Sequence, residues 1–168
     1  ENAMNSYAAT NTTAATAPTR SAAAGKASTV ARHLPTAARV LTGLVFFFFG
    51  LLGVLAFAGL IPLSGPSTPP PQGAADFTAA MMKTGYLFPM VKLTEFVAGA
   101  MLLSNRFVPL ALALLAPIVV NIFAFHAFLA PSGVRLAAVV LALEVYLAWT
   151  YRGAYRPMLA ARASRAGE

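Results

Sequence analysis

Four apolar stretches, each close to the length that crosses a lipid bilayer, constrain the fold of this chain more than any other feature. They cover about residues 39–62, 86–103, 107–129 and 134–150. A helix needs about 20 mostly apolar residues to span the hydrocarbon region. In total 58% of the 168 residues are hydrophobic and 10% are charged, which is more apolar surface than a soluble domain could bury. The sequence therefore predicts an all-α integral membrane protein, folded as a four-helix bundle.

The placement of charge predicts the orientation of the bundle. The chain has 12 Lys and Arg against 5 Asp and Glu, and the basic residues gather at its two ends. They are Arg20, Lys26, Arg32 and Arg39 before the first stretch, and Arg152, Arg156, Arg162 and Arg165 after the last. Basic residues beside spanning helices favour the cytoplasmic side, so both termini are expected there, in a bacterial inner membrane crossed four times. No basic stripe carries interleaved exposed aromatics, which speaks against a nucleic-acid partner.

The segments outside the four stretches divide the chain into three parts. Residues 1–35 are rich in Ala, Thr and Ser without a hydrophobic period, and we expect a disordered cytoplasmic tail. Met4 is interpreted as the initiator and residues 1–3 as a cloning remnant. The membrane domain is expected at 36–158, followed by a basic cytoplasmic tail at 159–168.

The connections add local expectations. A Pro/Gly/Ser loop at 62–73 is placed on the outer side, and residues 76–85 predict a short interfacial helix that ends at Gly85. Pro117 lies inside the third stretch and predicts a loosened or kinked helix. A face of small residues for close helix contact is formed by Gly43, Gly50 and Gly53. It is compatible with simple lipid-tolerant packing or with a dimer.

Five polar residues interrupt the apolar stretches and are the candidate site. They are Lys92, Glu95, Asn121, His126 and Glu144. Ionisable side chains near the bilayer centre cost about 2.5–3.5 kcal/mol each on insertion scales, so they normally face a bundle interior and find partners. Such a cluster could relay protons or bind a polar quinone headgroup. It could equally hold four helices in register.

The spacing of these residues limits the chemistry. Lys92 and Glu95 are three residues apart and can pair on one helical face. Asn121 and His126 are about 140° apart around an ideal helix, so they share a pocket only if neighbouring helices flank them or Pro117 distorts the helix. No spacing signature supports a metal held by carboxylates and His126, and no second spanning His exists for a bis-His haem. The chain has no Cys, which removes thiol exchange and iron–sulfur ligation.

Three parts of the sequence carry a resemblance to a known family. They are RVLTGLVFFFFG at 39–50, the TGY at 84–86 that leads to KLTE at 92–95, and NRFVPLALALLAPIVVNIFAFHAFL at 105–129. Over residues 36–158 the chain resembles the DoxX family of small four-helix bacterial membrane proteins. The family takes its name from a subunit associated with thiosulfate:quinone oxidoreductase.

The resemblance implies a four-helix membrane bundle and makes Glu95, Asn121 and His126 the positions to which a shared role would attach. It does not justify a specific thiosulfate reaction, because Cys is absent and we expect no soluble catalytic domain beside the bundle. Whether the chain is itself an enzyme stays open.

Three functions are compatible with these features. The leading hypothesis is an accessory subunit of a redox- or quinone-linked membrane assembly, with an intramembrane polar pocket and a quinone as candidate ligand. The second is a carrier or channel for small solutes or protons, and the third is a membrane scaffold or assembly factor. The expected partners are the lipid bilayer and either a second copy of the chain or redox subunits.

Overall fold

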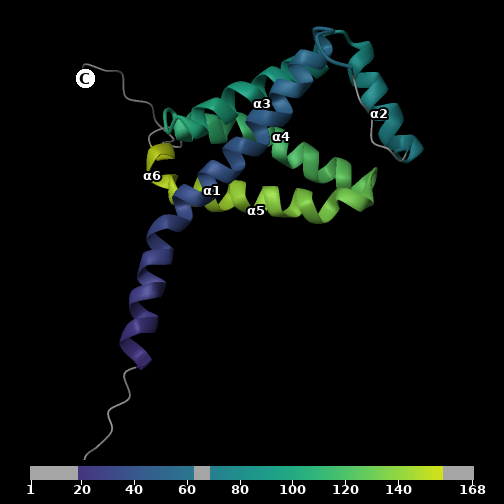
Figure 1. Ribbon diagram of the computed structural model, residues 1–168. Helices are drawn as coiled ribbons and strands as arrows, with labels where there is room; N and C mark the ends of the chain where they lie inside the picture. Colours follow the sequence, from purple (N-terminus) through teal and green to yellow (C-terminus); the bar gives the residue numbers. More distant parts are fainter. Residues whose placement is uncertain (1–18, 63–68, 157–168) are drawn as a thin grey trace, which may run out of the picture. The chain divides into compact units, whose positions relative to one another are not determined.

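The computed structural model describes residues 19–62 and 69–156, with side chains from residue 33 onward, and these residues form helices without strands. The elements are α1 (Thr19–Phe57), α2 (Gln72–Lys83), α3 (Leu87–Leu103), α4 (Val108–Phe128), the short 3-10 turn η1 (Pro131–Gly133), α5 (Val134–Thr150) and α6 (Arg152–Tyr155) (Figure 1). The chain divides into two units after His33. The second unit, from Leu34 onward, contains all five candidate site residues.

Three helical segments are long and apolar enough to cross a membrane. They are His33–Phe57 of α1, Val108–Phe128, and Pro131–Thr150. α2 and α3 meet the same criteria only together, and they are bent by 92° at the break between them. α3 alone has 17 residues, which corresponds to about 26 Å at the helical rise. An all-helical membrane fold is thus supported with three spans, or four if the bent pair is one span.

The helix boundaries agree with the sequence in the second half of the chain and differ in the first. α5 has the predicted bounds, and α3 and α4 differ from prediction by about one residue. α1 begins at Thr19, well before the predicted start near Arg39, because the preceding segment is rich in Ala, the strongest helix former. Residues 19–35 are therefore helical. The remainder of the expected N-terminal tail and the tail at 159–168 lie outside the described residues.

α2 also begins earlier than predicted. It starts at Gln72, inside the expected loop, directly after Pro71, because the fixed φ of a proline suits the entry to a helix. It ends at Lys83, and Gly85 follows with a φ of +75°, a conformation that glycine adopts without a Cβ penalty. Gly85 is thus the stop that the sequence predicted.

Glycines bring α1 and α3 into close contact as an antiparallel pair. A Cβ built on Gly50 would lie 2.7 Å from the Cα of Phe96, and one built on Gly99 would lie 2.7 Å from the Cα of Phe47. The rings of Phe47 and Phe96 pack beside the crossing, 5.0 Å apart between centroids. Small residues allow such close approach of helix backbones. Gly50, on the predicted small face, therefore contacts α3 of the same chain.

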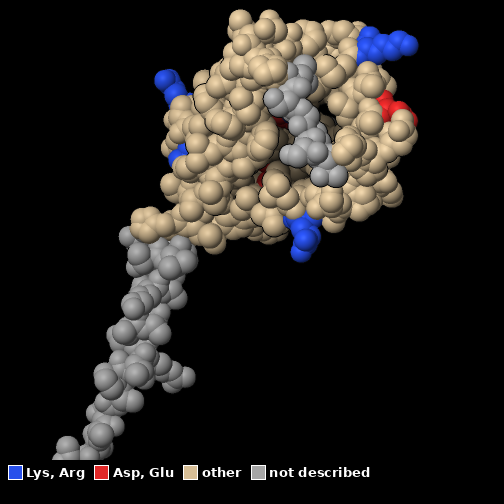
Figure 2. Space-filling model, turned by 45° about the vertical axis from the view of Figure 1, so that its right-hand side comes forward, with Lys and Arg blue, Asp and Glu red and all other residues tan. Residues whose placement is uncertain are grey.

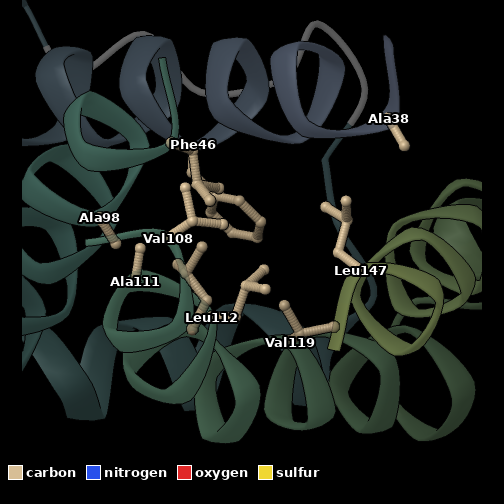
Figure 3. Close-up of a cluster of buried hydrophobic side chains, with 10 residues drawn as sticks. Ala38, Phe46, Ala98, Val108, Ala111, Leu112, Val119 and Leu147 are labelled. Atoms are coloured by element: carbon tan, nitrogen blue, oxygen red, sulfur yellow. The ribbon is translucent and has the colours of Figure 1, made fainter. Parts of the chain in front are cut away.

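Aliphatic side chains from four helices fill one end of the second unit, which we call the packed half. Its buried residues are Ala38, Phe46, Ala98, Leu102, Val108, Ala111, Leu112, Leu115, Val119 and Leu147 (Figure 3). α4 supplies five of these ten residues and is therefore the central helix of the packed half. Buried Arg39 donates from its guanidinium to the carbonyl of Leu102 at the C-terminal end of α3. A cation there complements the helix dipole.

Candidate functional site

The other end of the same helices borders a partly open cavity of about 540 Å³, and we call this end the cavity half. The antiparallel order brings the middle of α1, the start of α3, the second half of α4 and the start of α5 to one level. α2 contributes the remaining wall. Small-molecule sites are typically concave, mostly apolar and of about 300–1,000 Å³, so the volume suits a ligand of moderate size.

The cavity wall is mainly apolar, with polar side chains from three helices. The apolar residues are Val45, Phe46, Phe49, Phe77, Met81, Leu87, Phe88, Val91, Pro117, Ile118, Ile122, Phe125, Leu136, Ala137 and Val140. The polar residues are Thr78, Lys92, Glu95, Asn121 and His126. Four of the five candidate site residues thus line one cavity.

The outer surface around these helices is predominantly apolar. Figure 2 shows a face with few charged side chains, on which uncharged residues surround a hollow. Large apolar side chains such as Leu44, Phe48, Val139 and Val145 are exposed. A soluble protein rarely exposes so much contiguous apolar surface. These faces suit contact with lipid.

Lys92 and Glu95 form an ion pair in the cavity wall. The Nζ of Lys92 lies 2.8 Å from Oε2 of Glu95, and their side chains are 24% and 4% exposed. The predicted pairing on one face of α3 is therefore present. Nζ also lies 5.8 Å from the centroid of the Phe88 ring, within reach of a cation–π contact. Gly53 of α1 accommodates the Lys92 stem, because a Cβ on Gly53 would overlap that side chain.

His126 is fixed at the far end of α4 by the turn that follows. Its Nδ1 lies 3.1 Å from the carbonyl oxygen of Ala130. Gly133 in η1 lies against the ring, since a Cβ there would overlap the imidazole. Phe125 packs edge-on to the same ring, with 5.3 Å between centroids. The turn signal at 130–133 could not indicate that Gly133 lies against His126, because that contact arises only when the turn folds back over α4.

Asn121 and His126 reach the same cavity although an ideal helix separates them by about 140°. The cavity is bounded by α3 on one side of α4 and by α5 on another, and Pro117 lies in its wall. Flanking by neighbouring helices, one of the two routes that the sequence left open, is therefore present. α4 itself is continuous from Val108 to Phe128 with Pro117 inside it.

α2 covers one side of the cavity. Phe77, Thr78 and Met81 line it, and the Phe77 ring packs on Phe125 of α4 with 5.6 Å between centroids. The Thr78 hydroxyl donates to the carbonyl of Ala74 at 2.9 Å. The sequence predicted this segment only as an interfacial helix. Its role in the cavity wall was missed because a 12-residue helix gives no indication of where its apolar face packs.

Glu144 does not line the cavity. It is 4% exposed, and its Oε2 has no hydrogen-bond partner among the described residues. It follows Ala137 and Val140, two cavity residues, on the same face of α5, one turn closer to the packed half. Beyond it the Tyr155 hydroxyl donates to the carbonyl of Pro109 at 2.9 Å. Burial and, secondarily, the charge of Glu144 raise the pKa of Tyr155 above its ordinary value.

Comparison with known proteins does not indicate what this site binds. No protein-family model, curated protein or solved structure matches the chain. Within residues 19–62 and 69–156, no three His, Asp or Glu side chains are grouped closely enough to hold a metal ion. The arrangement offers hydrogen-bond donors and acceptors from three helices in the wall of a mainly apolar cavity. It can therefore orient a ligand that combines a polar head with an apolar body.

Proposed function

We propose that this chain is a DoxX-like protein that crosses a bacterial inner membrane four times, with both termini in the cytoplasm, and serves as an accessory subunit of a quinone-linked redox assembly. In this proposal α3 is a short fourth span and α2 lies at the outer interface. The observation that carries the proposal is the convergence of Lys92, Glu95, Asn121 and His126 on one cavity.

The wall chemistry supports a quinone-type ligand. A quinone headgroup is a planar ring with two opposed oxygens, and aromatic side chains such as Phe49, Phe77 and Phe125 favour contact with planar rings. The ammonium of Lys92 and the amide of Asn121 can donate to those oxygens. The long apolar tail of a membrane quinone would remain among the apolar faces of the helices.

The rival functions are less well supported by the described residues. A carrier needs a polar path to both sides, whereas fully buried aliphatic side chains, including Leu112, Leu115 and Leu147, fill the packed half. A scaffold needs only well-packed helices and has no use for a cavity of about 540 Å³.

Direct binding tests the proposal. The full chain in lipid nanodiscs would be titrated with a short-tailed ubiquinone analogue, and binding measured by calorimetry. We expect saturable binding that Asn121→Leu weakens by about tenfold, because a lost hydrogen bond to a buried oxygen is worth about 1.4 kcal/mol. Leu114→Ala is the matched control, since Leu114 lies on α4, is 39% exposed and does not line the cavity.

A second measurement tests the redox assembly. Membranes that contain the chain and its native partners should reduce added quinone, and His126→Ala should slow that reduction without lowering the amount of assembled protein. No saturable binding by the wild-type chain, or unchanged binding and reduction in the cavity variants, would refute the proposal. The scaffold alternative would then remain.

A further inference from the structure

The two ring nitrogens of His126 have different partners, and this difference determines what the cavity can bind. A carbonyl oxygen only accepts hydrogen bonds, so the 3.1 Å contact between Nδ1 and the oxygen of Ala130 requires the proton on Nδ1. In a neutral imidazole the other nitrogen, Nε2, then carries a lone pair and acts as an acceptor.

The turn after α4 determines which of the two ring nitrogens a ligand can reach. Ala130 accepts from Nδ1, and a Cβ on Gly133 would overlap both Nδ1 and the adjacent Cε1 of the ring. The turn thus covers the Nδ1 edge. Because His126 also lines the cavity, the edge available to a ligand is the one that carries Nε2.

Two other cavity residues present acceptors as well. The Thr78 hydroxyl already donates to the carbonyl of Ala74, so its oxygen is left to accept. Glu95 receives Lys92 on Oε2 and keeps a second carboxylate oxygen, which only accepts when ionised. The donors that remain are the other ammonium protons of Lys92 and the amide of Asn121. A ligand that brings its own O–H groups would satisfy more of these atoms than one that only accepts.

We propose, as an extension of the quinone-binding function, that the cavity selects the reduced, hydroxyl-bearing form, a hydroquinone, with one O–H donating to Nε2 of His126 and with Gly133 as the positioning residue. The hydroxyl oxygen can still accept from Lys92 or Asn121. A quinone carbonyl cannot donate and leaves Nε2 without a partner. Burying an unpaired acceptor lowers affinity, so we expect the reduced form to bind about tenfold more tightly or better.

Paired titrations test the preference. The nanodisc-embedded chain would be titrated with a short-tailed ubiquinol under anaerobic conditions and with the matching ubiquinone. The wild type should prefer the quinol by about tenfold, and His126→Phe should lose that preference because it keeps an aromatic ring without an acceptor. Gly133→Ala should reduce the preference by displacing the imidazole. Gly153→Ala is its control, since a Cβ on Gly153 meets nothing within 4 Å.

Nitrogen NMR tests the tautomer of His126 on which the inference rests. In a His33→Gln background His126 is the remaining histidine, because the chain has two. Its neutral ring should show a protonated Nδ1 and a bare Nε2, and the wild-type spectrum tests this even if Gly133→Ala fails to fold. Equal binding of both ligand forms, or a proton on Nε2 of the neutral ring, would overturn the inference alone. Absence of binding by either form would refute the quinone-binding function itself.

Discussion

The two ends of the same helices are built in opposite ways. The packed half is filled by Ala, Val and Leu side chains that are almost completely buried, with α4 at the centre. The cavity half is walled by large aromatic residues from α1 to α4 and contains Pro117. Mainly aliphatic side chains thus fill one end, whereas large aromatic side chains line the space at the other.

The two halves also differ in how their buried polar residues are paired. In the cavity half, Glu95 is paired with Lys92 and His126 bonds to Ala130. In and beside the packed half, the Oγ1 of Thr42 and the Oε2 of Glu144 are buried without a partner among the described residues. The cavity half therefore tolerates its charges through defined contacts. Glu144 is the exception that a binding role for the cavity does not explain.

The largest expected effect is at the junction of the two halves. Gly50→Leu would place side-chain atoms into the backbone of α3, since even a Cβ would lie 2.7 Å from the Cα of Phe96. We expect the chain to lose its folded state, with destabilisation above about 4 kcal/mol, because backbone cannot move aside as a flexible side chain can. Size-exclusion chromatography and thermal unfolding in detergent would measure this.

Gly153→Leu is the matched control for that substitution. Gly153 lies in α6, and a Cβ there meets nothing within 4 Å. It should leave the elution profile and the unfolding temperature nearly unchanged. Equal tolerance at both positions would contradict the close crossing of α1 and α3.

The next largest effect comes from comparing one residue of each half on the same helix, α4. Leu112 is 1% exposed in the packed half, and Leu112→Ala should cost about 3 kcal/mol through lost contacts and a new void. Ile122 lines the cavity and is only partly buried, so Ile122→Ala should cost about 1 kcal/mol. Unfolding in mixed micelles of increasing SDS content would give both free energies. Similar costs at the two positions would remove the distinction between the halves.

A third comparison uses the two buried carboxylates. Glu95→Gln leaves Lys92 without its counter-charge, and we expect a loss of about 2 kcal/mol, below the usual cost of breaking a buried pair because Lys92 is 24% exposed. Glu144→Gln removes a charge that has no described partner, so stability should stay the same or rise. The same SDS titration applies to both variants. A larger loss for Glu144→Gln would show that Glu144 has a partner that the described residues do not include.

Sequence reasoning predicted the helices well where apolar length decides the outcome. The bounds of α3, α4 and α5 follow from long apolar runs between strong turn signals. The start of α1 was mispredicted because low hydrophobicity was taken as disorder, whereas alanine content favours a helix.

The candidate site was predictable only in part. Polar residues in apolar runs are rare enough to be noticed, and Lys92, Glu95, Asn121 and His126 do line one cavity. Their apolar neighbours could not be identified, because a Phe that lines a cavity and a Phe that faces lipid look alike in sequence. Glu144 was grouped with the other four because the sequence does not show at which level along α4 a residue of α5 will lie.

The smallest effect concerns Tyr155, at the edge of the packed half. Below about pH 9, Tyr155→Phe should cost about 1 kcal/mol, because it removes the hydrogen bond to the carbonyl of Pro109. The raised pKa of Tyr155 means that the folded chain holds the phenol proton more tightly than the unfolded chain does. The stability that Tyr155 contributes should therefore be lost as pH rises from about 10, its ordinary pKa, through the raised value.

The measurement is the difference in unfolding free energy between the wild type and Tyr155→Phe, followed from about pH 8 to about pH 11. That difference should shrink as the pH rises, and Glu144→Gln should move the change to lower pH because the charge of Glu144 is the second cause of the shift. Tyr86→Phe is the control, since Tyr86 is 64% exposed. A difference that stays constant with pH would show that Tyr155 titrates alike in both states. It would also show that the charge of Glu144 does not act on Tyr155.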